Sequence, residues 1–207
     1  MDRPDRPTRR RLPPEERRAS ILAAAAEAFA RQAYDEVGVA SIADAAGVSE
    51  ALVHRYFEGK AGLYAEVVRG QVSALAEAER AAQQELPERL AVRERIKVGL
   101  EVLLDHIADH PEGWAPPLRG AGTEPEEAVT IRREARASYV AALRRLIGVH
   151  GWRRHDYAVE GTLGFLDAAC LAWAEAGCPP EDRGHLVEAT LGALEGALGD
   201  WGKPGKE

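Results

Sequence analysis

The sequence is poor in cysteine, in long apolar runs and in β-forming patterns, and each shortage excludes a class of protein. Two cysteines among 207 residues, Cys170 and Cys178, cannot build a disulfide framework. No apolar run approaches the ~20 residues that a transmembrane helix needs, so no membrane partner is expected. Runs of β-branched residues and alternating apolar and polar positions are also absent. We therefore expect a cytoplasmic, all-α protein.

The charge of the chain, taken as a whole, has the wrong sign for a protein that binds nucleic acid, since the formal net charge is −7. However, the charge is unevenly distributed. Residues 1–64 contain 10 Lys and Arg against 10 Asp and Glu, whereas residues 65–207 contain 17 against 24. The acidity therefore belongs to the C-terminal part, and a neutral N-terminal part with an arginine-rich start remains compatible with DNA binding.

Alanine, leucine, glutamate and arginine dominate the chain and favour helix almost throughout. Proline pairs separate several of the helical stretches because proline removes a backbone donor. The expected helices span residues 15–32, 39–46, 50–57, 61–84, 88–110, 124–147, 155–176 and 181–199. We expect three units, which are a flexible arginine-rich arm over 1–14, a compact helical domain over 15–65 and a larger helical domain over 66–207.

Residues 39–57 have the pattern of two short helices joined by a tight turn. Gly47 suits the left-handed conformation that ends a helix. Ser49 is a good N-cap for the next helix, because its hydroxyl can accept a hydrogen bond from a free backbone N–H. Val53 and Phe57 would face inward. This pattern predicts a helix-turn-helix.

The opposite face of the second short helix would then point outward. It carries Glu50, Ala51, His54 and Arg55, with Leu52 and Tyr56 at its margins. A short helix with this face can enter the major groove of DNA, and Arg55 is the strongest candidate for a base contact because arginine can bind guanine O6 and N7 together. Lys60, at the start of the following helix, can reach a phosphate. The alternative is a helical hairpin whose polar face is merely solvated.

These segments resemble a known family. The run Arg17-Arg18-Ala19-Ser20-Ile21-Leu22 through Phe29, the run Ile42-Ala43-Asp44-Ala45-Ala46-Gly47-Val48-Ser49, and Tyr56-Phe57-Glu58-Gly59-Lys60 with Leu63 are similar to the N-terminal domain of the TetR family of bacterial transcriptional regulators. The resemblance implies a three-helix, helix-turn-helix DNA-binding domain followed by a larger helical domain for ligand binding and dimerisation. It implies DNA contacts at Gly38, Ser49, Glu50, Ala51, Leu52, His54, Arg55, Tyr56 and Lys60.

The sequence departs from the family pattern at a few of these positions. Gly38 stands where the family often has a threonine, so one hydroxyl that would face a phosphate is missing. His54 stands where a tyrosine is common, and its imidazole could contact a phosphate instead. Leu52 replaces a common threonine, which favours contact with a thymine methyl group over a hydrogen bond. Ala33 replaces the usual glycine after the first helix. The departures concern individual contacts rather than the class of protein.

The arginine-rich arm carries Arg9, Arg10 and Arg11, which could reach the minor groove or a phosphate, although a solvated tail is the alternative. If the arm contacts DNA, deletion of residues 1–12 weakens operator binding and flattens the dependence of affinity on salt, because fewer counterions are released. Titrations of operator binding at several salt concentrations measure both effects. An unchanged slope would contradict the contact.

Two C-terminal stretches each carry an apolar stripe at helical spacing, beside a second stripe of mostly small residues such as Gly161, Ala168, Gly192 and Gly196. Two such helices from each subunit could form a four-helix interface, and the resemblance implies the same homodimer. The residues expected at this interface are Leu163, Leu166, Cys170, Val187, Leu191, Leu194 and Leu198. In the alternative, both stripes close the core of a single chain.

The helices expected at 88–110 and 124–147 would, by the same resemblance, enclose a pocket for a small-molecule effector. The expected lining residues are His106, His110, Trp114, Tyr139, Phe165 and Trp173. Ordinary packing in the core is the alternative for each of them.

His106 and His110 also have the spacing of a metal-binding pair on one helical face, with Asp105 and Asp109 beside them. No clear third ligand stands nearby in the sequence, and a phosphate-binding glycine loop and a Gly-x-Ser-x-Gly motif are absent. We therefore expect no metal, no cofactor and no enzyme activity. The alternative is a small helical enzyme with a metal-assisted pocket at this pair.

The leading hypothesis from the sequence is a homodimeric, ligand-responsive transcriptional repressor. It would bind a pseudo-palindromic operator in double-stranded DNA and be released by a small-molecule effector that prefers the conformation unable to bind DNA. A further alternative, an adaptor that assembles through its C-terminal helices, predicts no salt-sensitive binding to any duplex.

Overall fold

The computed structural model describes residues 13–111, 114, 124–148 and 151–199, and every regular element in these ranges is helical. Residues 1–12, which include the arginines of the expected arm, lie outside the described residues. The N-terminal elements are α1 (Pro14–Phe29), η1 (Tyr34–Glu36), α2 (Val39–Ala46) and α3 (Glu50–Phe57). They are followed by α4 (Lys60–Gln84), α5 (Val92–Asp109), α7 (Glu126–Ile147), α8 (Arg153–Glu175), η2 (Pro180–Asp182) and α9 (Arg183–Leu198). The all-α class is confirmed.

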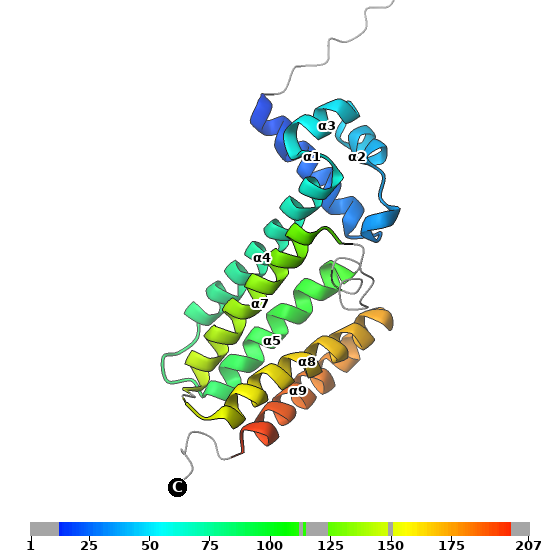
Figure 1. Ribbon diagram of the computed structural model, residues 1–207. Coiled ribbons are helices and arrows are strands. Elements are labelled where there is room, and N and C mark those ends of the chain that lie inside the picture. Colours follow the sequence, from blue (N-terminus) through cyan, green and yellow to red (C-terminus); the bar gives the residue numbers. More distant parts are fainter. Residues whose placement is uncertain (1–12, 112–113, 115–123, 149–150, 200–207) are drawn as a thin grey trace, which may run out of the picture.

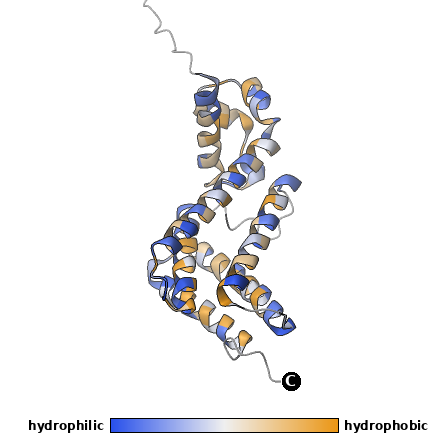
Figure 2. Cartoon of the chain, turned by 90° about the vertical axis from the view of Figure 1, so that its left-hand side faces the viewer, coloured by the Kyte–Doolittle hydropathy of each residue, from blue (hydrophilic) through white to orange (hydrophobic). Residues whose placement is uncertain are grey.

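Figure 1 shows two parts joined by the long helix α4. We call α1–α3 with the first turns of α4 the head, and the rest of α4 with α5, α7, α8 and α9 the body. The helices of the body lie alongside one another, and α7 runs beside α4 up to the head (Figure 1). Figure 2, turned by 90°, shows the same head and body as separate lobes. The chain therefore separates a small helical head from a larger helical bundle.

The helix boundaries agree with the sequence prediction to within a few residues. The largest difference is at α5, which begins at Val92 rather than at residue 88. The guanidinium of Arg95 donates hydrogen bonds to the carbonyl oxygens of Pro87, at 2.6 Å, and of Glu88, at 3.2 Å. These bonds hold the preceding residues in a turn, because those carbonyl oxygens are satisfied outside a helix.

The core of the head is built from apolar residues of all its helices and from one turn of α7. Phe29 and Phe57 pack there with the apolar residues of α2 and α4. Val68 and Ala128, which come after residue 65, are fully buried in the same cluster. Ala128 lies in the first turn of α7, so the body contributes directly to the core of the head.

The core of the body contains all the residues expected at a subunit interface. None of them is more than 5% exposed in the single chain, and they pack together with apolar residues of α5 and α7. They are Leu163, Leu166, Cys170, Val187, Leu191, Leu194 and Leu198. This burial corrects the assignment, because side chains enclosed by their own chain offer no surface to a partner. The alternative, a single-chain core, describes these stripes.

Candidate nucleic-acid interface and interior polar groups

The turn between α2 and α3 has the geometry that the sequence predicts. Gly47 takes the left-handed conformation, with φ of 66°, and ends α2. Ser49 occupies the N-cap position of α3, but its hydroxyl makes no capping hydrogen bond, contrary to expectation. Its backbone carbonyl instead accepts from the N–H of Leu52 at 2.9 Å. The turn is therefore fixed by backbone geometry rather than by a serine cap.

Helix α3 presents the face expected to contact DNA. Val53 is fully buried and Phe57 is 4% exposed, which fixes the rotation of the helix about its axis. The outward-facing residues are Glu50, Ala51, His54 and Arg55, while Leu52 and Tyr56 are half-buried at the margins. Arg55 has no side-chain partner among the described residues, so its guanidinium is available to a ligand.

The angle between α3 and α4 depends on a glycine that the sequence analysis did not single out. A Cβ atom at Gly62 would lie 2.1 Å from the carbonyl oxygen of Phe57, which no larger residue could accept without a backbone shift. Glu58, between the two helices, takes a left-handed conformation with φ of 54°. The first turn of α4 is thus pressed against the last residue of the exposed helix, and this contact sets how α3 projects from the head.

The residues expected to contact phosphates lie at the edges of this face. Gly38 is the exposed N-cap of α2, and its carbonyl accepts from the Ser41 hydroxyl at 2.7 Å. Lys60 begins α4, and its Nζ lies 4.3 Å from the centre of the Tyr34 ring and 3.5 Å from the Asp35 carbonyl oxygen. The ammonium group of Lys60 is therefore held against η1 rather than extended freely into solvent.

Two of the residues expected to line an effector pocket lie close together at the end of α5, with His106 in its last turn and His110 directly after it. The ring centres of His106 and His110 are 5.0 Å apart, and His110 Nδ1 lies 3.2 Å from the His106 carbonyl oxygen. Burial, followed by the neighbouring His110, lowers the pKa of His106 and favours its neutral form. Within the described ranges, no group of three or more His, Cys, Asp or Glu could hold a metal ion.

The remaining pocket candidates divide between interior and surface. Trp173 is buried, and its Nε1 donates to the Pro179 carbonyl at 2.9 Å, which ties the end of α8 to the following turn. Tyr139 and Trp114 are partly buried against the core of the body. Phe165 is 41% exposed on α8, so in the single chain it does not share the interior position of the other candidates. Its side chain lies on the outer face of the helix, where another chain could reach it.

A carboxyl group inside the body was missed by the sequence analysis. Glu79 of α4 is half-buried and has no hydrogen-bond or ion-pair partner among the described residues, and its charge acts on Tyr139 of α7. Burial raises the pKa of Glu79 from 4.5 to about 7. The pKa of Tyr139 is also raised, first by burial and then by Glu79. Nothing in the local sequence marks Glu79 as interior, because a glutamate in a helix is normally exposed.

Glu79 predicts a specific dependence of stability on pH. Because its pKa is higher in the folded chain than in the unfolded chain, ionisation of Glu79 disfavours the fold as pH rises from about 4.5 to about 7. Replacement by Gln removes this ionisation. The gain in unfolding free energy of Glu79→Gln over the wild type should therefore be larger at about pH 8 than at about pH 5, by an amount on the order of 1 kcal/mol after solvent screening. Urea unfolding at both pH values measures it, and an equal gain at both would contradict the burial of a lone carboxyl.

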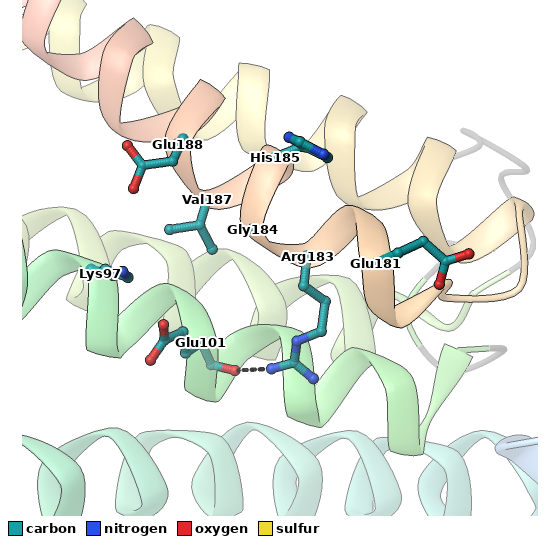
Figure 3. A pocket seen from close by; sticks show the side chains of 8 residues that line it. All are labelled: Lys97, Glu101, Glu181, Arg183, Gly184, His185, Val187 and Glu188. Carbon is teal, nitrogen blue, oxygen red and sulfur yellow. Dashed lines mark hydrogen bonds between the residues drawn. The ribbon is translucent and has the colours of Figure 1, made fainter.

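A surface groove lies elsewhere on the body, between α5 and the start of α9 (Figure 3). Its lining is mostly charged and includes Lys97, Glu101 and Glu188. The guanidinium of Arg183 crosses to the Glu101 carbonyl oxygen, at 3.2 Å, and pairs with Asp105 at 2.7 Å. None of the residues expected to line an effector pocket lies in this groove. No helix of the described chain is long and apolar enough to cross a membrane.

The chain is similar to known bacterial regulatory proteins in sequence and in structure. Residues 21–67 match the model of "Bacterial regulatory proteins, tetR family". The chain is 32% identical over 192 residues to the HTH-type transcriptional activator FasR of Mycolicibacterium smegmatis, and the match covers 91% of this chain and 85% of FasR. A tetR-family regulator from Streptomyces coelicolor has a similar structure, with a TM-score of 0.79, 22% identity, and 90% of this chain and 82% of that chain covered. The structure of the fatty acid degradation regulator FadR from Bacillus halodurans is also similar, with a TM-score of 0.69 and 21% identity. The match covers 91% of this chain and 98% of that chain.

These similarities extend over both parts of the molecule. The family model spans most of α1 and all of α2 and α3, the helices that carry the exposed residues expected to contact DNA. The match to FasR continues through the body, and the solved structures share the whole helical architecture. The chain belongs to the TetR family of bacterial regulatory proteins.

Proposed function

We propose that the protein is a ligand-responsive transcriptional regulator that recognises an operator through α3. The observation that carries this proposal is the exposed face of α3, on which His54 and Arg55 project while Val53 and Phe57 anchor the helix in the head. An arginine without a protein partner can form paired hydrogen bonds with guanine in the major groove. We propose the cytoplasm as its location, because a regulator of this kind acts where bacterial DNA lies.

The proposed regulator is a homodimer, and the small-residue stripes of α8 and α9 support this. A Cβ atom at Gly161, Gly164, Gly192 or Gly196 would meet no described atom of the single chain within 4 Å. A glycine inside a helix costs about 1 kcal/mol relative to alanine, and no contact among the described residues requires glycine at these positions. Close packing of a second copy against this face would explain why glycine stands at these positions, because small residues let helices approach tightly.

Aromatic residues strengthen the case for the same face. On α8, Tyr157 is 66% exposed and Phe165 is 41% exposed. Large exposed apolar side chains beside a stripe of small ones form complementary ridges and grooves when two such faces meet. We therefore assign the subunit contact to the outer face of α8 and α9, opposite the leucine stripes that fill the core. A dimer would present two α3 helices to two half-sites of an operator.

We further propose that a small molecule bound within the body releases the operator, which makes the regulator a repressor where the operator overlaps a promoter. An effector shifts the equilibrium only if it binds the released conformation more tightly than the DNA-bound one. His106, His110, Trp114 and Tyr139 are the proposed contacts, and Trp114 Nε1 is buried without a hydrogen-bond partner among the described residues. FadR of Bacillus halodurans is named a fatty acid degradation regulator, so compounds with long acyl chains are the first to test.

Activation of transcription is the second candidate, because the relative FasR is named an activator. The two candidates predict opposite results for a reporter gene placed behind a natural promoter that contains an operator of the protein. Deletion of the regulator raises reporter expression if it represses, and lowers expression if it activates.

One experiment tests the function as a whole. Duplexes that bind the full-length protein are selected from random DNA, and the enriched duplex is then used to screen small molecules for release. Long-chain fatty acids and their coenzyme A thioesters form the first panel, with short-chain analogues as the control. An enriched, pseudo-palindromic sequence supports the DNA-binding role, and failure to enrich any sequence would contradict it.

A further inference from the structure

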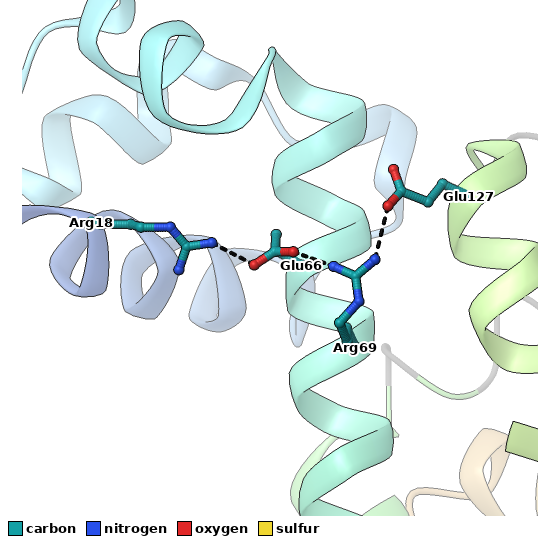
Figure 4. A network of polar contacts seen from close by, with 4 residues as sticks. All are labelled: Arg18, Glu66, Arg69 and Glu127. Atoms are coloured by element: carbon teal, nitrogen blue, oxygen red, sulfur yellow. Dashed lines mark hydrogen bonds and ion pairs between the residues drawn. The ribbon is translucent and has the colours of Figure 1, made fainter. Parts of the chain in front are cut away.

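A line of charged residues connects the body to the exposed helix of the head (Figure 4). The carboxylate of Glu127, in the first turn of α7, lies 2.9 Å from the guanidinium of Arg69 on α4. Arg69 also pairs with Glu66, one turn earlier on α4, and Glu66 lies 2.5 Å from the guanidinium of Arg18 on α1. We call Arg18, Glu66, Arg69 and Glu127 the relay.

The relay ends against the DNA-facing helix. The guanidinium of Arg18 lies over the ring of Phe57, 4.9 Å from its centre, and Phe57 is the last residue of α3. Phe57 is buried, and its carbonyl oxygen is the group that presses on Gly62. Charged and aromatic contacts therefore run without a break from α7 of the body to the end of α3.

A second set of contacts anchors the same part of α7. Ala128, next to Glu127, is fully buried in the core of the head. The Tyr64 hydroxyl donates to Glu124, and Arg132 pairs with Glu124 at 3.3 Å. The Tyr64 ring packs edge-on against Phe29, with ring centres 4.8 Å apart. The start of α7 is thus attached to the head by apolar contacts that hold it in place and by the relay, which reaches α3.

We propose that the relay is a positioning device that fixes the orientation of α3 relative to the body, and that a movement of the first turn of α7 changes this orientation. The chain continues from head to body only through α4, and a single helix leaves the head free to tilt and rotate. A second attachment through α7 removes that freedom. This inference rests on the proposed function, because it assigns the route by which the body controls operator binding.

The test compares two adjacent glutamates. Glu126 and Glu127 both lie in the first turn of α7 and are exposed, but Glu126 has no partner among the described residues. Glu127→Gln should lower affinity for the selected operator by about two- to fivefold, the range expected for an exposed ion pair. Glu126→Gln should leave it unchanged. The dependence of affinity on salt should be the same in both variants, because neither residue contacts phosphate.

A double-variant cycle separates the relay from a local effect. If Glu127 acts through Arg18, the variant Arg18→Gln with Glu127→Gln should bind the operator no more weakly than Arg18→Gln alone. Additive losses would overturn the relay. An equal loss of operator affinity in Glu126→Gln and Glu127→Gln would overturn it as well. Glu126 and Glu127 both lie in the first turn of α7, but only Glu127 contacts Arg69, so an equal loss could not come from that contact.

The orientation of the head is measured without DNA. Spin labels are placed at the exposed positions Ala51 of α3 and Ala141 of α7, in full-length Cys178→Ser protein diluted with unlabelled chains. Cys170 is buried and its thiol pKa is raised to about 12, so it does not react with the label. The distance distribution should broaden or shift in Glu127→Gln but not in Glu126→Gln, with unchanged melting temperatures. Identical distance distributions in the two variants would overturn the relay, whether or not the protein binds DNA. Failure of the wild type to bind any duplex would contradict the proposed function but not the relay.

Discussion

Replacing Arg55 with alanine is expected to raise the dissociation constant of the operator about 5- to 150-fold, which corresponds to about 1–3 kcal/mol. Arg55 is exposed on α3 and has no side-chain partner among the described residues, so its loss removes no internal contact. The variant should also lose its preference for one base in each half-site, because a paired contact with guanine carries both affinity and specificity. Binding of operator duplexes substituted at each position, measured by fluorescence anisotropy, tests both effects.

Arg80→Ala is the matched control for this substitution. Arg80 is exposed on α4 in the body and also lacks a partner among the described residues, so the variant loses the same charge away from α3. Its operator binding should remain close to that of the wild type. If Arg55→Ala instead weakens binding equally for every sequence, Arg55 contacts phosphate rather than a base. Unaltered binding would contradict any contact between Arg55 and the operator.

Replacing Gly164 with glutamate is expected to dissociate the dimer. A Cβ atom at this position meets none of the described residues within 4 Å, and glutamate favours helix more than glycine does, so the chain should fold. In a dimer formed through the outer face of α8 and α9, the carboxylate would be buried without a partner, which costs about 3–5 kcal/mol. Analytical ultracentrifugation should show the dissociation constant of the dimer raised by a factor of about a hundred or more.

Gly70→Glu provides the comparison. Gly70 is also an exposed helical glycine whose added Cβ would meet no atom within 4 Å in the part of the chain that the structure describes, but it lies on α4. This variant should dimerise like the wild type. Gly164→Glu should also lose most of its operator affinity, because one head alone reaches a single half-site. A Gly164→Glu protein that remains dimeric would place the subunit contact on another face.

The head could be predicted from the sequence because its signals are local. Gly47 marks the left-handed end of α2, and the spacing of Val53 and Phe57 determines which face of α3 is exposed. The serine cap was the exception. Ser49 has the right position, but the carbonyl bonds of the turn are formed without its hydroxyl. A residue type that favours a cap shows where a helix begins, whereas the hydrogen bond itself depends on the side-chain rotamer.

The body was predicted less completely, because periodicity shows that a stripe is buried but not which chain buries it. Leu163 and Leu194 have the spacing expected of an interface and of a core alike, and the structure places them in the core. The relay could not be predicted either. Arg69 and Glu127 are separated by 58 positions, and neither lies in a recognisable motif. Their contact follows from the packing of α7 beside α4, which only the assembled fold defines.

The spacing of the half-sites tests most directly the claim that two copies of α3 read the DNA together. Equilibrium binding is measured on the selected operator, and on versions with about 5 or about 10 base pairs inserted at its centre, since about 10 base pairs complete one turn of DNA. Insertion of half a turn moves the second half-site to the opposite side of the duplex, so it should reduce binding to the level of a scrambled duplex. Equal affinity for the original operator and for the half-turn insertion would contradict paired recognition by a dimer.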